Sequence, residues 1–204
     1  MCTSQFWLIY VMAVMSIFQG YYTLNVYKAY GYTKEGLQDD IFITKVGSIA
    51  AFMGAMRFVW SATMDYIDYN SFRKVYGALL LTQTILGATI DIAAESGKSL
   101  FALWLCLMLF TEGAHFVVIP NALRILYKEA APSIYGVIFT YTGLSSFFIM
   151  MIVQSNFGKN YASVFTLSAC LSGLAFLLLL FCFKETTLVS EPPQAKTTTI
   201  KLQR

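Results

Sequence analysis

Six long apolar runs, separated by short polar stretches, constrain this chain more than any other feature of its sequence. They lie near residues 6–27, 44–64, 75–94, 100–121, 134–154 and 161–183. A helix needs about 20 mostly apolar residues to cross a hydrocarbon layer about 30 Å thick, and each run has about this length. We therefore predict an all-α membrane protein with six transmembrane helices, surrounded by membrane lipid.

The composition agrees with this prediction. Of the 204 residues, 57% are hydrophobic and 12% are charged, whereas a soluble domain carries about 25% charged residues. The net charge is only +3, and Lys and Arg occur in short clusters between apolar runs, so we expect no nucleic-acid partner. The four cysteines form no C-x-x-C pair and His115 is the single histidine, so we expect no metal site and no cofactor.

The sequence also lacks the short signatures of the common enzyme classes. It contains no G-x-S-x-G, no H-E-x-x-H, no Walker loop and no dinucleotide fingerprint. A single histidine further restricts nucleophile–base schemes. We therefore expect no enzymatic activity.

The distribution of basic residues predicts the orientation of the chain. With six spans both ends lie on one side, and that side collects nine of the 14 Lys and Arg residues. The other side has five, namely Lys28, Lys34, Lys45, Lys98 and Lys159. By the positive-inside rule both termini are cytoplasmic. The polar stretch 184–204 has few groups able to form a core, so we expect a disordered cytoplasmic tail.

The second and sixth runs favour different roles. Gly47, Ala51 and Ala55 recur every four residues in the second run, a pattern typical of closely packed transmembrane helices. The sixth run is apolar nearly all round, so we expect it to face lipid.

Charged residues of both signs follow the second run closely. Arg57 lies near its cytoplasmic end, Asp65 and Asp68 come next, and Arg73 and Lys74 begin the third run. Charges at the edge of the hydrocarbon are costly unless they pair or reach the interface. This loop is therefore either a turn held in place by ion pairs or an ordinary cytoplasmic flank.

This segment, residues 57–77, resembles the loop between the eighth and ninth helices of the major facilitator superfamily. The signature there is roughly G-R-x-x-x-G-x-x-x-D-x-x-G-x-R/K, and Arg57, Asp65 and Arg73 occur in the corresponding order. Met56 stands where a glycine commonly precedes the arginine. Downstream, TEGAHFVVIPNALRILYKEAAPSIYGVIFTYTGLSS resembles helices ten and eleven of the branch with oxalate:formate antiporters and monocarboxylate transporter-like proteins.

The resemblance covers only the carboxyl-terminal six-helix half of such a transporter. It implies a 3+3 inverted repeat, secondary transport of small organic anions such as monocarboxylates, and a second six-helix half supplied by a homodimer or another chain. It also implies that Asp65 docks on that second half, with Arg57 and Arg73 as further gating or docking candidates. The alternatives are a non-transporting scaffold or accessory subunit, and a truncated transporter fragment.

The fourth run carries the ionisable pair Glu112 and His115, three residues apart and therefore on one helical face. Ionisable groups at membrane depth are candidates for a functional site, so this pair is our candidate for proton coupling. The alternative is that both residues only bond to neighbouring helices. Pro120 follows, and we expect it to kink or end the helix.

Polar residues in two runs are candidates for lining a transport pathway. These are Gln19 and Asn25 in the first run and Tyr135 and Thr140 in the fifth. Side chains of this kind also hydrogen-bond between helices, which is the alternative role. The fifth run contains no Lys or Arg, which departs from the oxalate-transporter pattern.

Overall fold

The computed structural model describes residues 4–66, 72–155 and 157–183, and throughout these ranges the chain is helical with short connections. The long elements are α1 (Ser4–Thr33), α2 (Asp40–Ala55), α3 (Arg57–Tyr66), α4 (Phe72–Ser96), α5 (Lys98–Tyr127), α6 (Ala131–Ile138), α7 (Thr140–Gln154) and α8 (Tyr161–Phe181). Two single-turn 3-10 helices, η2 (Lys128–Ala130) and η3 (Phe157–Lys159), precede α6 and α8. The predicted tail 184–204 lies outside the described residues.

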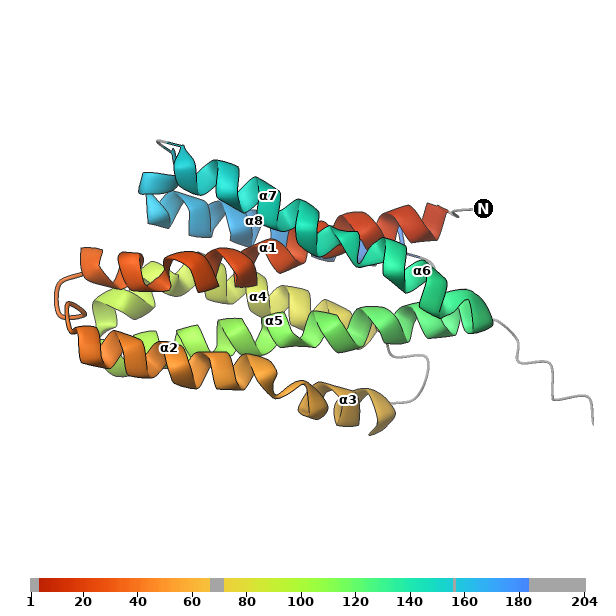
Figure 1. Cartoon of the computed structure of the whole chain (residues 1–204), viewed down its shortest axis with the longest axis horizontal. Helices are drawn as coiled ribbons and strands as arrows, with labels where there is room; N and C mark the ends of the chain where they lie inside the picture. The colour runs from red at the N-terminus through yellow and green to blue at the C-terminus, as the bar shows by residue number, and fades with distance from the viewer. Residues whose placement is uncertain (1–3, 67–71, 156, 184–204) are drawn as a thin grey trace, which may run out of the picture.

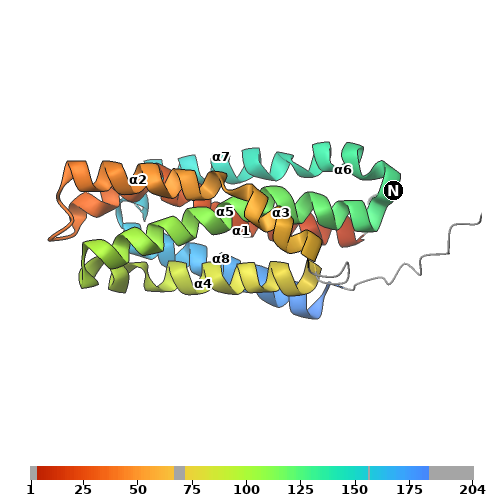
Figure 2. The same ribbon diagram turned by 90° about the horizontal axis from the view of Figure 1, so that it is seen from below.

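The helices form a bundle with α1 and α5 at its centre. Figure 2 shows α2 and α7 on one side of this central pair and α4 and α8 on the opposite side. The most extensive helix pairings are α4 with α8, α2 with α5, α1 with α8 and α4 with α5. As a result, the side of α1 and α5 that faces away from α4 and α8 is flanked by α2–α3 and by α6–α7.

Five helical stretches among the described residues are long and apolar enough to cross a membrane. They are Ser4–Thr33, Asp40–Met64, Phe72–Ser96, Lys98–Gln154 and Tyr161–Phe181. The chain therefore has the helices of a multi-pass membrane protein. The fourth stretch is 57 residues long and contains α5, α6 and α7, and Figure 1 shows α6 and α7 running back from the end of α5.

Two of the predicted runs are interrupted helices. Run 44–64 is divided at Met56, whose ψ of 43° leaves the helical range and whose N–H bonds to the Met53 carbonyl. Run 134–154 is divided at Phe139, where the Thr140 hydroxyl donates to the Val137 carbonyl. Side chains that bond back to the preceding turn in this way bend helices. Neither Met56 nor Phe139 is a proline or glycine, so the breaks could not be predicted from these residues.

Pro120 does not end α5, which continues to Tyr127. Because proline has no N–H, the carbonyl four residues earlier, that of Phe116, has no partner in the helix. The remaining turns of α5 are supported by packing, since Val118, Ile119, Ala122 and Leu123 are all buried in the core.

The packing faces of α2 and α8 differ from the sequence expectation. Gly47 and Ala50 are buried and Gly54 lies against α5, whereas Ala51 and Ala55 are exposed, so the prediction that the small residues of this run make α2 a packing helix is right only in part. The stretch Asp40–Met64 is the least buried of the five. The prediction that the sixth run faces lipid is only partly right, since α8 packs on both α4 and α1 and exposes one side.

The closest approach of α2 and α5 is made by two glycines. A Cβ atom on Gly113 would lie 2.3 Å from the carbonyl oxygen of Gly54, and one on Gly54 would lie 3.1 Å from that of Leu109. The neighbouring atoms are backbone and cannot rotate away. A side chain at Gly113 would therefore separate the two helices.

We expect Gly113→Ala to lower the free energy of unfolding by about 1–3 kcal/mol, the usual cost of overpacking. Gly143→Ala is the matched control, because nothing lies within 4 Å of a Cβ at this position in α7. The control should be neutral or slightly stabilising, since alanine favours helices over glycine. Thermal unfolding in one detergent, followed by circular dichroism, compares the two, and equal midpoints would contradict the close approach.

Candidate functional site

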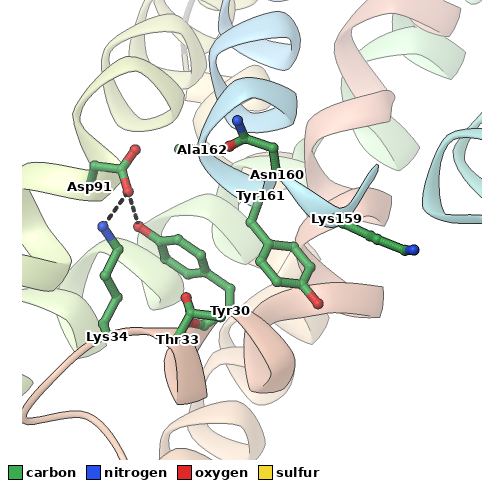
Figure 3. Close-up of a pocket in the computed structure, with 8 residues that line it drawn as sticks. All are labelled: Tyr30, Thr33, Lys34, Asp91, Lys159, Asn160, Tyr161 and Ala162. Carbon is green, nitrogen blue, oxygen red and sulfur yellow. Dashed lines mark hydrogen bonds and ion pairs between the residues drawn. The ribbon is translucent and has the colours of Figure 1, made fainter. Parts of the chain in front are cut away.

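Ion pairs join the helices at the end of the bundle where α1, α4 and α7 end. Lys34 lies 2.8 Å from Asp91 and 3.3 Å from Glu95, and the Tyr30 hydroxyl donates to Asp91 at 2.6 Å. Figure 3 shows Asp91 between Lys34 and Tyr30 beside a pocket of about 460 Å³. Partial burial lowers the pKa of Lys34, but Asp91 and Glu95 outweigh it, so the net shift is upward and the pair stays ionised at neutral pH.

Two further pairs tie α2 to its neighbours at this end. Lys98 of α5 lies 2.8 Å from Asp39, and Lys28 of α1 lies 2.7 Å from Asp40. The Lys98 ammonium and the Phe42 backbone N–H both lower the pKa of Asp39, which caps the start of α2. Lys28, Lys34 and Lys98 were predicted on one side of the membrane, and all three lie in ion pairs with helix ends.

Glu112 occupies the middle of the 30-residue helix α5 and is only 6% exposed. Its side chain packs against α1 at Gly20, where an added Cβ would lie 2.0 Å from Glu112 Cγ. Only glycine leaves room for the carboxyl group here. The sequence of α1 therefore makes space for an acidic side chain at the centre of the bundle.

Arg57 is the first residue of α3 and packs on α5 near Glu112. Its guanidinium carbon stands 4.1 Å from the centroid of the Phe116 ring, one helical turn from Glu112 on α5, or about 6 Å along the helix axis. The sequence placed Arg57 towards the cytoplasmic end of its span, whereas the break at Met56 puts it near the middle of the bundle.

Aromatic rings continue from Phe116 towards α6 and α7. The Phe139 ring centroid lies 6.1 Å from that of Phe116, 5.6 Å from that of Tyr135 and 6.1 Å from that of Tyr141. Arg57 is exposed and Tyr21 and Tyr135 are half-buried. A solute that reaches Arg57 therefore meets a cation beside aromatic rings and the half-buried Tyr135.

His115 points away from that group into the core. Its Nε2 lies 2.7 Å from the Ser16 hydroxyl, which is 3.0 Å from the Tyr76 hydroxyl, and its Nδ1 lies 3.2 Å from the Glu112 carbonyl oxygen. A neutral imidazole satisfies all these contacts, with Nδ1–H donating to the carbonyl and Nε2 accepting from Ser16. All three side chains are fully buried, so a proton on Nε2 would place a charge in an apolar core.

The predicted pathway residues of α1 lie in two different places. Gln19 is buried next to Gly87 of α4, and its Oε1 accepts from Ser172 of α8, so it faces the side opposite the charged pair. Asn25 is exposed, and its side-chain amide donates to the Tyr21 carbonyl within α1. The two predicted pathway residues of α1 therefore do not lie together.

The remaining candidates, Thr140 and Arg73, lie nearer the end of the bundle that we predict to be cytoplasmic. Thr140 is exposed at the α6–α7 break and hydrogen-bonds the Tyr10 hydroxyl at 3.0 Å, beside Tyr135. Arg73 donates to the Leu180 carbonyl at the end of α8, where a cation favours the helix dipole. Asp65 lies in α3, but its side chain is outside the described residues, as is Asp68.

Sequence reasoning did not single out Ser16, Tyr76 or Phe116, the partners of the two predicted ionisable residues. A serine inside the first apolar run and a tyrosine in the third were the only signals, and both are common in membrane helices. Aromatic Phe116 follows His115 directly, and no spacing rule connects it to Arg57 on another helix.

Comparison with known proteins gives the chain no family. No protein-family model matches it, and no curated protein matches it significantly.

Proposed function

We propose that this chain is one six-span half of a secondary transporter that moves small organic anions, such as monocarboxylates, together with a proton. The observation that carries the proposal is the placement of Arg57 over Phe116 on α5, one helical turn from the buried carboxyl group of Glu112. Ionisable groups are rare inside membranes unless they serve transport or pairing.

The six-span count rests on the 57-residue stretch Lys98–Gln154 crossing twice. At 1.5 Å per residue a single helix of this length would extend about 85 Å, far beyond a bilayer. The reversal after α5 supports a first crossing by α5 and a second by α6 and α7. Phe6 near the start of α1 and Phe183 just after α8 belong to one core cluster. This is expected if both ends of the bundle segment lie on the same side of the membrane. The basic residues favour the cytoplasm for that side.

Arg57 supplies what an anion needs on leaving water. A carboxylate in a partly desolvated site requires a compensating charge and hydrogen-bond donors, and a guanidinium offers both in a fork that matches a carboxylate. Glu112 competes for the same guanidinium. When Glu112 takes a proton, Arg57 is released to bind the solute, and this links anion binding to proton binding.

His115 in this proposal positions Glu112 and does not itself carry the proton. Its Nδ1 bonds to the Glu112 backbone carbonyl within α5, and its Nε2 links to Ser16, which holds α5 against α1 at the level of the carboxyl group. The Glu112 side chain itself packs on α1 at Gly20, and Arg57 of α3 lies over Phe116, one helical turn away on α5.

A second six-helix unit completes the pathway in this proposal. Transporters built from two such halves bind solute between them and rock one half against the other. The helices that flank the side of α1 and α5 facing away from α4 and α8 expose large apolar side chains, Phe52 and Phe58 on α2–α3 and Phe147 and Phe148 on α7. A homodimer or another six-helix chain would cover this side.

The test is the native mass of the chain extracted from its own membrane in mild detergent, followed by uptake of labelled acetate into vesicles of the purified assembly. We expect an assembly with at least twelve spans and uptake driven by an inward proton gradient. Full uptake by a strict monomer would overturn the requirement for a second half. A stable complex without uptake would favour the scaffold alternative.

A further inference from the structure

The connection between α1 and α2, residues 34–39, is tied at both ends to helices that it does not itself join. Its first residue, Lys34, forms an ion pair with Asp91 of α4 at 2.8 Å. Its last residue, Asp39, forms an ion pair with Lys98 of α5, also at 2.8 Å. The connection therefore lies over the end of the bundle that we predict to face away from the cytoplasm.

Between the two ion pairs, Leu37 closes the end of the core. Leu37 is 0% exposed and belongs to the core cluster that includes Ala94 of α4 and Phe101 of α5. Gly36 precedes it with a φ of 83°, a left-handed conformation that favours glycine. The chain thus turns at Gly36 and inserts one apolar side chain between the helix ends.

Few other contacts hold this connection on the bundle. Among the residues that the structure describes, its backbone hydrogen bonds all stay within residues 31–43. The Gln38 amide donates to the Tyr32 carbonyl, which is part of α1. The connection can therefore move away without breaking a backbone hydrogen bond to α4 or α5, which is the property of a segment that opens locally.

The two ion pairs are open to water. The side chains of Lys34 and Asp91 are 21% and 33% exposed. Those of Lys98 and Asp39 are 45% and 43% exposed. Ion pairs at exposed positions contribute little to stability and are screened by salt. They suit a contact that forms and breaks repeatedly, and the strength of that contact depends on the ionic strength.

A pocket beside Lys34 leaves room for this movement. It has a volume of about 460 Å³ and is lined by Thr33 and Lys34 on one side and by residues 159–162 on the other. Figure 3 shows Lys34 and Asp91 across the pocket from those residues. The start of the connection can therefore shift without displacing the beginning of α8.

We propose that residues 34–39 form a salt-sensitive lid over the outer end of the bundle. The lid opens when its two ion pairs release and Leu37 leaves the core, and opening admits water to the buried side chains of Ala94 and Phe101. High ionic strength favours the open lid because it screens both ion pairs. The lid does not depend on the proposed transport, and its movement can be measured without a solute.

The test is hydrogen exchange of the backbone amides of the full chain in nanodiscs of phosphatidylcholine, followed by mass spectrometry. Raising the salt from about 0.01 M to about 1 M shortens the Debye length from about 30 Å to about 3 Å. We expect the amides of residues 34–39 to exchange about two- to fivefold faster at high salt, as the loss of an exposed ion pair predicts. Amides in the middle of α4 and α5 should keep their rates.

Variants at each ion pair separate the lid from a general effect of charge. Asp39→Asn removes the pair with α5 but can still accept from the Phe42 N–H and cap α2. This variant and Lys34→Gln should each exchange the lid amides about two- to fivefold faster at low salt. Lys28→Gln is the matched control, because the exposed Lys28–Asp40 pair at the same end contains no lid residue. It should leave the lid amides at the wild-type rate.

A thiol beneath the lid shows whether the core opens. Ala94→Cys, in the chain whose native cysteines are replaced by serine, should react with methyl methanethiosulfonate at a rate that rises with salt in the same proportion as the exchange of the lid amides. Leu37→Ala should raise both rates by about 30-fold or more, since Leu→Ala in a core has the largest effect of these changes.

Several outcomes would overturn the lid. Lid amides that exchange only with global unfolding would show a fixed cap. Equal acceleration along α1, α4 and α5, or an effect of Lys28→Gln as large as that of Asp39→Asn, would show that the ion pairs stabilise the whole bundle. Faster exchange of the lid amides with an unreactive thiol in Ala94→Cys would show a surface movement that leaves the core closed.

Discussion

Arg57→Gln is expected to lower the uptake of labelled acetate by about 100-fold at subsaturating concentration. Each hydrogen bond from a charged donor to a buried anion contributes about 1.5–3 kcal/mol, and 1.4 kcal/mol corresponds to a factor of ten. Loss of the Arg57 guanidinium, a charged group that can donate two hydrogen bonds, therefore lowers the uptake of acetate by about two factors of ten. The cation over Phe116 has no basic neighbour in the fifth span to replace it.

Two further variants separate charge from geometry. Arg57→Lys keeps the charge but loses the fork, so its uptake should lie between the wild-type and glutamine values. Lys45→Gln removes an exposed cation from α2, and we expect only a small, salt-dependent change. All variants must retain the native mass of the assembly. Uptake by Arg57→Gln within a factor of three of wild type would exclude Arg57 as the binding cation.

The sequence predicted the helices well because their signal is local. Apolar runs of membrane-spanning length mark α1, α4 and α8 directly; the structure extends the first two predicted ranges by a few residues at each end and ends α8 two residues earlier than predicted. The break at Met56 could not be predicted. It contains no proline or glycine, and the local turn is set by how α3 docks through Trp60 onto the Phe110 carbonyl.

Glu112 and His115 show how far helical periodicity can predict a site. The spacing of three correctly placed Glu112 and His115 on neighbouring positions of one helix. It did not indicate which helices cross there, and these decide the chemistry, because Gly20 accommodates the carboxyl group and Ser16 binds the imidazole. The same limit applies to Arg57, whose partner Phe116 lies on a different helix.

The order in which the helices pack explains why the exposure of α2 and α8 was predicted wrongly in part. Small residues in α2 and apolar residues in α8 are compatible with either a buried or an exposed helix, since lipid and helix surfaces are both apolar. Ala51 is exposed because α2 contacts mainly α5, while α8 is held between α4 and α1. These neighbours follow from the order of the helices in the bundle, which single runs do not encode.

Glu112→Gln is expected to abolish the pH dependence of uptake. In the wild type a proton enters with the anion, so uptake rises as the external pH falls. Glutamine has the shape of the protonated carboxyl group but cannot release a proton, and it leaves Arg57 without a competing negative charge. Uptake by this variant should therefore be the same across the pH range, and an imposed proton gradient should no longer concentrate acetate.

Exchange of internal for external acetate distinguishes lost coupling from lost binding. It requires no net proton movement, so Glu112→Gln should retain it, whereas Arg57→Gln should lose it. His115→Gln is the matched control on the same helix, because its amide can still accept from Ser16; we expect a less stable protein with the wild-type pH profile. A Glu112→Gln variant that keeps the wild-type slope with pH would assign the proton to another group, and a His115→Gln variant with a flat profile would assign it to the imidazole.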